Sequence, residues 1–154
     1  MVEEAYRRYS TAKEYVEAIK LILSSPHHRG QHAMMAIRPS HLLAGFAVEL
    51  YLKAWLLADG RPSDAVQKQG HRLLDLYGSA LARGFTNDAR IRKLVENLAE
   101  PHGQNRDHVF RYSQASSEIK PLIWTSVLPI FDALDVVVDT HVGASASHGP
   151  KPGH

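Results

Sequence analysis

The sequence predicts an all-α protein, folded as an antiparallel up-and-down bundle of four to five helices. Three observations lead to this prediction. Apolar residues recur every three or four positions in several long segments, no segment alternates apolar and polar residues as a strand does, and one segment, residues 39–59, is apolar on almost every side. Mostly short connections join these segments, which favours helices that run antiparallel to their neighbours.

Length and composition indicate one globular domain. The chain has 154 residues, of which 44% are hydrophobic and 22% charged, and this length is enough to enclose a hydrophobic core. We expect residues 1–142 to form the bundle and residues 143–154, which are rich in Gly, Ser, Ala and Pro, to form a disordered tail. The absence of cysteine excludes disulfides, thiolate metal sites and cysteine nucleophiles.

Charge and hydropathy bear on location and partners. The formal net charge of +2, with both signs alternating along the chain, does not by itself predict nucleic-acid binding. The acidic start, Met1 to Glu4, lacks the pattern of a signal peptide. No segment approaches the roughly 20 uninterrupted apolar residues of a transmembrane helix. We therefore expect a cytoplasmic protein that does not enter a membrane.

The first two predicted helices carry most of the apolar surface. The first runs from Glu3 to Ser24, with charged residues such as Lys13 on a solvated surface and a buried stripe of Ala5, Tyr9, Ala12, Val16, Ile19 and Leu23. The second runs from Pro39 to Asp59, because proline is tolerated in a first turn and Gly60 can adopt the left-handed conformation that ends a helix. A helix apolar on nearly all sides belongs in the middle of a bundle.

A third and a fourth helix follow a polar stretch, 63–70, that we expect to be a loop or a frayed turn. The third runs from about His71 to Ala82 and should bury Leu73, Leu74, Tyr77 and Leu81. The fourth opens at Thr86 or Asn87, whose side chains can cap exposed amides, and ends before Pro101. Its predicted buried stripe is Ile91, Leu94, Val95 and Leu98.

The last predicted helix follows a polar, irregular segment, residues 102–114. It runs from about Ser117 to Thr140, with apolar residues at helical spacing. Pro129 lies in its interior and should kink it near Thr125, whose carbonyl loses its usual partner.

Two polar features could form a site near the central helix. Glu49 and Lys53 lie one turn apart in the orientation that favours an ion pair. They form either a pair at the solvent edge or a partly buried functional pair, and burying both charges would indicate a cleft or an interface. His71 either caps the third helix or lines the same cleft as Glu49.

A third feature is the segment that contains Arg106, His108, Arg111 and Tyr112. Such residues can bind phosphate and stack a base, or anchor a loop to the carbonyls of helix ends. His27, His28 and His32 have a spacing found among metal ligands, but no second cluster of acidic and histidine residues accompanies them. We expect no metal and no cofactor.

The order of these features resembles that of HEPN domains, the "higher eukaryotes and prokaryotes nucleotide-binding" helical bundles. The central helix resembles the second helix of that family, an apolar run with Glu-x-x-x-Lys, here Glu49 and Lys53, before a turn that contains glycine. The segment from Gly70 to Leu76 resembles the family's His-x-Leu-x-x-Leu segment, and Phe110-Arg111-Tyr112 resembles an aromatic-Arg-Tyr feature before the final helix.

The resemblance implies a homodimer, often encoded beside a nucleotidyltransferase-type partner, and many members are RNA-cleaving toxins or defence proteins. Their signature is an Arg and a His four to six residues apart, with the Arg stabilising charge and the His moving a proton. Here Arg106 precedes His108 by only two residues, and Arg111 has no His at the required distance after it.

The departure from that signature favours a non-catalytic member. We expect a dimeric binding or regulatory protein whose polar cleft, lined by Glu49, Lys53, His71, Arg106, His108, Arg111 and Tyr112, binds RNA, a nucleotide or a nucleotidyltransferase-type partner. One alternative is a metal-independent endoribonuclease that uses a divergent Arg106 and His108 pair. Another is a structural helical adaptor.

Overall fold

The computed structural model describes residues 2–26, 35–105 and 122–144, and most of them lie in helices. The helices are α1 (Val2–Ser24), α2 (Ile37–Ala58), α3 (Ser63–Lys68), α4 (Leu73–Leu81), α5 (Ala89–His102) and α6 (Trp124–Val142). These residues contain no strand. The predicted all-α class is confirmed, with six helices in the described part of the chain.

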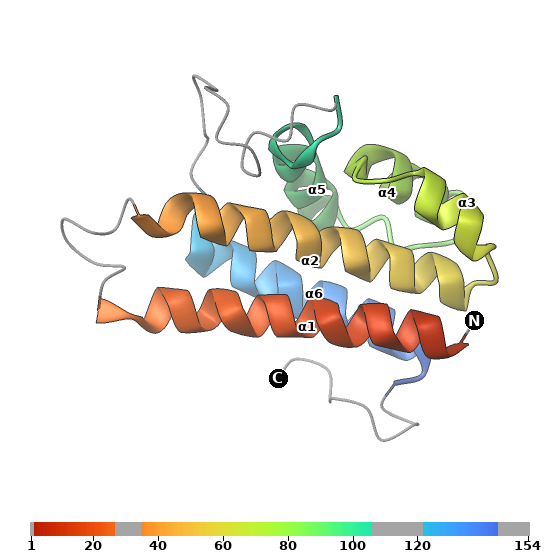
Figure 1. Ribbon diagram of the computed structural model, residues 1–154, viewed down its shortest axis with the longest axis horizontal. Helices are drawn as coiled ribbons and strands as arrows, with labels where there is room; N and C mark the ends of the chain where they lie inside the picture. The colour runs from red at the N-terminus through yellow and green to blue at the C-terminus, as the bar shows by residue number, and fades with distance from the viewer. Residues whose placement is uncertain (1, 27–34, 106–121, 145–154) are drawn as a thin grey trace.

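Helix α2 lies at the centre of the structure. Helices α1, α2 and α6 extend along the long axis of the molecule, and α3, α4 and α5 gather on the other side of α2 (Figure 1). Helix α2 contacts each of the other five helices over the described residues. This arrangement explains why the sequence of α2 is apolar on nearly all sides.

The two ends of α2 follow the expected chemistry. The helix begins at Ile37, two residues before the predicted start, and Pro39 lies in its first turn. Beyond Asp59, Gly60 adopts a φ of 87°. The amide of Gly60 donates to the carbonyl of Leu57 at 3.0 Å, and the amide of Arg61 donates to that of Leu56 at 3.0 Å. These two bonds form a Schellman motif, which satisfies carbonyls that the helix leaves without partners.

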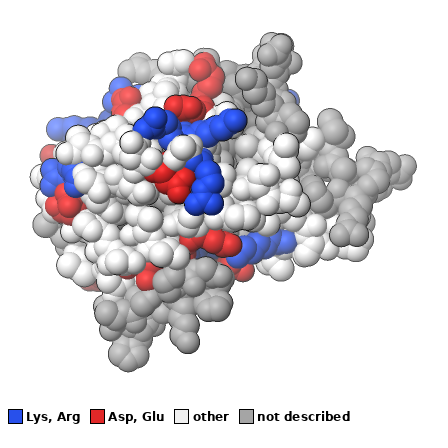
Figure 2. Space-filling view, turned by 180° about the vertical axis from the view of Figure 1, so that it is seen from behind, with Lys and Arg blue, Asp and Glu red and all other residues white. Residues whose placement is uncertain are grey.

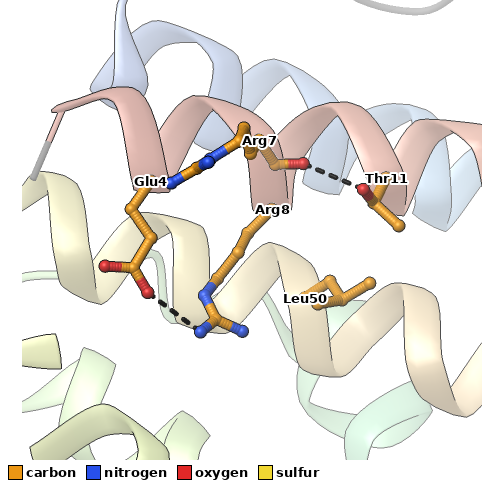
Figure 3. A pocket seen from close by; sticks show the side chains of 5 residues that line it. All are labelled: Glu4, Arg7, Arg8, Thr11 and Leu50. Atoms are coloured by element: carbon orange, nitrogen blue, oxygen red, sulfur yellow. Dashed lines mark hydrogen bonds and ion pairs between the residues drawn. The ribbon is translucent and has the colours of Figure 1, made fainter. Parts of the chain in front are cut away.

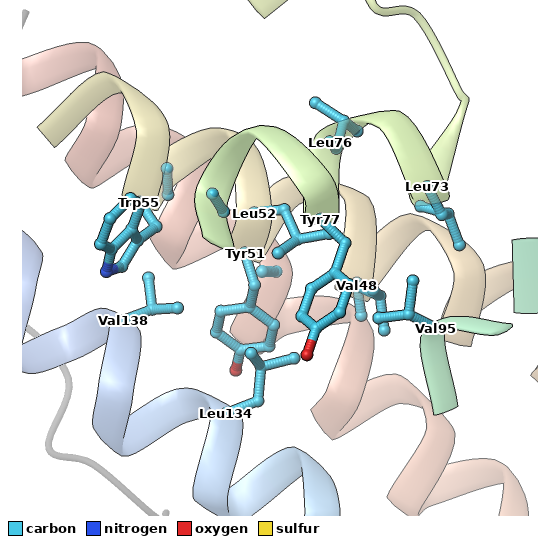
Figure 4. Packing of buried hydrophobic residues seen from close by; sticks show 14 of the residues in the cluster. Val48, Tyr51, Leu52, Trp55, Leu73, Leu76, Tyr77, Val95, Leu134 and Val138 are labelled. Atoms are coloured by element: carbon cyan, nitrogen blue, oxygen red, sulfur yellow. The ribbon is translucent and has the colours of Figure 1, made fainter. Parts of the chain in front are cut away.

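The hydrophobic core joins side chains from all the long helices. Figure 4 shows residues of α2, α4 and α6, among them Leu52, Tyr77 and Leu134, packed in one cluster. The predicted stripe of α5 is buried, and so is that of α1 except for Leu23, which is partly buried. The periodicity of these segments therefore identified their buried faces correctly.

The apolar surface of α2 faces this core. By length and composition alone α2 could cross a membrane, because the mean hydropathy of its most apolar 18-residue stretch is 1.3. However, 72% of that stretch is buried inside the protein. Core helices of globular proteins meet the same criterion, so this is weak evidence for a membrane span.

The predicted loop at residues 63–70 is wrong, because Ser63–Lys68 forms α3. Its only buried residue is Val66, which is fully enclosed in the core. A six-residue helix with one apolar anchor has too few residues to show a helical period in the sequence. Contact with the rest of the protein stabilises it instead.

The predicted buried face of α4 is partly wrong. Leu73 and Tyr77 are buried as expected, but Leu74 is 42% exposed and Leu81 is half-buried. Leu76 and Ala80 occupy the core instead, so the buried residues follow the i, i+3, i+4, i+7 pattern from Leu73. Leucines at 73, 74 and 76 are compatible with two helical faces, and packing selects one of them.

Three helix boundaries also differ from the prediction. Asp88, not Thr86 or Asn87, caps α5, because its carboxylate accepts from the amide of Arg90 at 2.8 Å. Helix α5 continues through Pro101 to His102, in a segment predicted to be irregular. Helix α6 begins at Trp124, because Ile123 before it has an extended backbone, so the continuous helix predicted from Ser117 is wrong, although Ser117 itself lies outside the described residues.

The C-terminal end of α6 reaches two residues beyond the predicted one. Pro129 lies inside this helix as expected, and the kink predicted there stays a prediction. Gly143 ends the helix with a φ of 75°, and Ala144 after it is buried. The rest of the predicted tail lies outside the described residues.

The prediction of a solvated Lys13 is wrong. Only 7% of this residue is exposed, and its ammonium lies 3.2 Å from a carboxylate oxygen of Asp135 on α6. The hydroxyl of Tyr51 on α2 donates to the other oxygen of Asp135 at 2.9 Å. Burial and the nearby Asp135 carboxylate raise the pKa of Tyr51, so its hydroxyl stays protonated and remains a donor. A partner 122 residues away leaves no signal near Lys13 in the sequence.

The surface carries charges of both signs in close proximity. Figure 2 shows Lys and Arg side chains beside Asp and Glu side chains on the face seen from behind, with broad areas between them that carry neither. Several exposed cations contact carboxylates, including Lys20 with Glu17 at 3.0 Å and Arg90 with Asp88 at 3.0 Å. This face therefore carries mixed charge, as the alternation along the sequence indicates.

Candidate functional site

A buried carboxylate, Glu49, is the centre of the candidate site. It is 3% exposed. One of its oxygens, Oε1, accepts from the ammonium of Lys53 at 2.6 Å. The other, Oε2, lies 2.8 Å from Nδ1 of His71 and 2.6 Å from Nε2 of His102. We call these four residues the Glu49 cluster. Of the two interpretations of the Glu49–Lys53 pair, the structure has the buried one.

Three separate elements supply the Glu49 cluster. Glu49 and Lys53 lie one turn apart on α2, and His102 is the last residue of α5. His71 lies in the turn between α3 and α4. It does not cap α4, because Arg72 precedes that helix and makes no side-chain capping bond. The ring of His71 instead contacts Glu49, as the cleft interpretation expects.

A glycine in α2 makes room for His102. A Cβ atom at Gly45 would lie 2.3 Å from Nδ1 of His102, far inside van der Waals contact. The ring of Phe46 stands edge-on to both imidazoles, with centroids 4.8 Å from His102 and 5.9 Å from His71. Gly45 lies one turn before Glu49, so the ring of His102 packs on the face of α2 that carries the carboxylate.

The carboxylate of Glu49 stays ionised despite its burial. Burial raises the pKa of Glu49, but the hydrogen bond from His102 and the charge and hydrogen bond of Lys53 lower it more, with a further contribution from His71. The net effect lowers the pKa of Glu49 from 4.5 to about 2. The negative charge that organises the cluster is therefore present throughout the neutral range.

The Glu49 cluster reaches solvent through His71. The side chain of His71 is 32% exposed, whereas those of Glu49, Lys53 and His102 are 4–5% exposed. A ligand would contact His71 first, and the other three residues would act on the ligand through their hydrogen bonds and charge around His71. The carboxylate and the two imidazoles form a donor set that can hold a proton or a metal ion.

Acid should weaken the Glu49 cluster only at low pH. The pKa of Glu49 is lower in the folded chain than in the unfolded one, so its contribution to stability is fully present above pH 4.5. That contribution is lost as the pH falls from 4.5 towards 2. A carbon-detected NMR titration of the Glu49 carboxyl should find its midpoint near 2 in the folded protein. The urea-unfolded chain is the control, and equal midpoints in the two states would contradict the effect.

Sequence reasoning missed His102. The prediction placed this residue in an irregular segment, because it ended the helix before Pro101. One local signal was available, since a glycine inside an apolar helix costs about 1 kcal/mol relative to alanine and indicates a close approach at that point. Gly45 is such a residue, but the sequence does not tell which side chain approaches it.

Four other predicted site residues, Arg106, His108, Arg111 and Tyr112, lie outside the described residues. Their convergence with the Glu49 cluster therefore stays a prediction. The histidines His27, His28 and His32, considered above as metal ligands, also lie outside the described residues.

A surface pocket of about 340 Å³ lies elsewhere, between α1 and α2. It is lined by Glu4, Arg7, Arg8, Thr11 and Leu50 (Figure 3). The guanidinium of Arg8 contacts Glu4 at 3.0 Å and the side chain of Gln67 at 3.2 Å, so its charge is already paired. This pocket shares no residue with the Glu49 cluster, and its internal pairing makes it the weaker candidate.

Comparison with known proteins finds no match among family models, curated proteins or solved structures. The resemblance to HEPN domains therefore depends on the sequence segments quoted above.

Proposed function

We propose that this chain is a dimeric HEPN-like binding or regulatory protein that contacts RNA or a nucleotide at the Glu49 cluster. We propose with it that the helices form the antiparallel up-and-down bundle of that family. The observation that carries the proposal is the buried Glu49 carboxylate, which is held by nitrogen atoms from three elements, and of the four described residues of the cluster only His71 is appreciably exposed.

The cost of burying charge supports a functional role for this cluster. Removing an ion pair from water costs several kcal/mol per ion, and an apolar pair of similar volume in the core is often at least as stable. Glu49 and Lys53 are nonetheless both nearly inaccessible. A polar cluster that joins three elements and opens at one imidazole is the kind of arrangement expected at a binding site.

The chain beyond α5 supports a phosphate-bearing ligand. Residues 106–121 begin four positions after His102, and they contain two arginines and aromatic residues. Arginine binds phosphate through paired hydrogen bonds, and aromatic rings stack on bases. Arg72, next to His71 in the sequence, is exposed but already paired with Asp75 at 3.1 Å, so it adds little to this argument. These features favour RNA or a nucleotide over a protein partner.

Replacing His71 should weaken RNA binding. We expect His71→Asn to raise the dissociation constant for a fluorescent single-stranded RNA about tenfold, the effect of losing roughly 1.4 kcal/mol of interaction. His141→Asn is the matched control, because His141 is 33% exposed and lies 3.4 Å from a carboxylate oxygen of Asp59. It should leave the affinity unchanged. No RNA or nucleotide binding by the wild-type chain would refute the proposal.

The same samples distinguish the alternatives. Cleavage of total RNA in the presence of a chelator, lost in Arg106→Ala or His108→Ala, would indicate the metal-independent endoribonuclease instead. Unchanged RNA affinity after joint replacement of Arg106, His108, Arg111 and Tyr112 would count against this segment as part of the site. Light scattering during gel filtration should give twice the 17.2 kDa mass of the chain, as the proposed dimer requires.

A further inference from the structure

We propose that Glu49, His71 and His102 form a zinc-binding site. This inference goes beyond the proposed function, and zinc binding can be measured without RNA. The donor atoms are a carboxylate oxygen and two imidazole nitrogens, and all lie within 4.8 Å of one another. Two histidines and one glutamate are an established ligand set for zinc, with a fourth position left for water or a ligand.

The distances within the Glu49 cluster suit the replacement of the hydrogen bonds between Glu49 and the two imidazoles by bonds to one metal ion. The two imidazole nitrogens lie 2.8 and 2.6 Å from the same carboxylate oxygen. Tetrahedral zinc with bonds of about 2.0–2.1 Å separates its ligand atoms by roughly 3.3 Å. Each nitrogen would therefore draw back from the carboxylate oxygen by about 0.5–0.7 Å, and the two nitrogens, which lie within 4.8 Å of one another, would come to a similar separation.

The surroundings hold the three donors in place. Lys53 contacts Oε1 of Glu49 and leaves Oε2 to the imidazoles. Close packing on Gly45 and Phe46 fixes the ring of His102. The packing that orients His102 is a supporting contact of the kind whose removal typically lowers metal affinity 10- to 100-fold.

Burial favours zinc over metals that need six ligands. Glu49, Lys53 and His102 are almost inaccessible, and only the side of His71 faces solvent. That opening suits a single solvent ligand, which completes a tetrahedral site. An octahedral ion with these three protein ligands would need three further ligands.

The charge of Lys53 opposes metal binding at this site. Its ammonium neutralises Glu49 and repels a divalent ion, so it lowers the affinity of the site for zinc. Replacing Lys53 with Met should therefore tighten zinc binding, the opposite of what replacing a ligand does. Zinc should also raise the melting temperature of Lys53→Met more than that of the wild-type chain, because the ion compensates the buried carboxylate.

Metal titrations of the full chain, freed of metal with a chelator, test the proposal. Calorimetry should find one Zn²⁺ site per chain that His71→Asn and His102→Asn each weaken at least tenfold, and Co²⁺ should give the intense visible absorption of tetrahedral coordination. His141→Asn should bind zinc as tightly as the wild type. A variant with Asn at His27, His28 and His32 should keep the site.

Three results would overturn the zinc site. The first is a wild-type chain that binds no Zn²⁺. The second is zinc binding that survives both His71→Asn and His102→Asn, and the third is a Co²⁺ spectrum of six-coordinate type. Because His71→Asn is the more exposed of the two replacements, it keeps the test valid if His102→Asn fails to fold. Zinc binding without RNA binding would support the zinc site and count against the proposed function, and RNA binding without zinc binding would do the opposite.

Discussion

Glu49→Gln should lower the free energy of unfolding by about 3–5 kcal/mol, the usual cost of removing one partner of a buried ion pair. Glutamine has nearly the same shape, so the substitution leaves no cavity. It does leave the ammonium of Lys53, 4% exposed, without a counter-charge. It also replaces the charged acceptor of two imidazoles with a neutral one. Urea unfolding followed by far-ultraviolet circular dichroism measures the loss.

A double-mutant cycle shows whether the loss comes from the stranded charge. Adding Lys53→Met to Glu49→Gln removes that charge, and the pair should recover at least half of the lost stability. Glu17→Gln is the matched control, because Glu17 makes an exposed ion pair with Lys20. Pairs of that kind contribute about 0–1 kcal/mol. A Glu49→Gln chain as stable as the Glu17→Gln chain would contradict the buried ion pair.

Gly45→Ala should have the second-largest effect, a loss of about 2–4 kcal/mol from overpacking and a broken hydrogen bond. The new methyl group would meet Nδ1 and Cγ of His102 at 2.3 and 2.8 Å, so the imidazole must move. Phe46 packs edge-on against the same ring, at 4.8 Å between centroids, and obstructs that movement. The displaced ring loses its contact with Glu49. Chemical unfolding, together with the NMR signals of the His102 ring, reports both effects.

Gly78→Ala is the control for this substitution. Gly78 also lies inside a helix, α4, but a Cβ atom there meets no atom within 4 Å. Alanine restricts the unfolded chain and has a higher helix propensity, so this variant should gain up to about 1 kcal/mol. A Gly45→Ala chain at least as stable as the Gly78→Ala chain would show that His102 does not lie against α2.

The predictions that were confirmed depend on patterns among residues close together in the sequence. The helical period of α1, α2 and α5 depends on residues three and four apart, and the Glu49–Lys53 pair lies within one turn, so both are visible in the sequence. Gly60 as the end of α2 is equally local. These are the parts of the structure where neighbours in sequence are also neighbours in space.

Contacts between distant residues account for what the sequence did not predict. His102 lies 53 residues from Glu49, and Lys13 lies 122 residues from Asp135. Nothing near Lys13 distinguishes it from an ordinary surface lysine. Helix α3 depends in the same way on Val66, whose burial is supplied by the surrounding core. Tertiary packing decided each of these cases.

The contacts of Asp135 also determine how three helices are positioned along their axes. Asp135 of α6 binds Lys13 of α1 and Tyr51 of α2 at once. Apolar side chains would tolerate a slide of α6 by one turn, about 5.4 Å. Such a slide would separate Asp135 from both partners and strand a carboxylate and an ammonium in the core, at a cost of several kcal/mol. The axial register of α1, α2 and α6 is thus selected by the polar contacts of Asp135 together with the apolar packing around them.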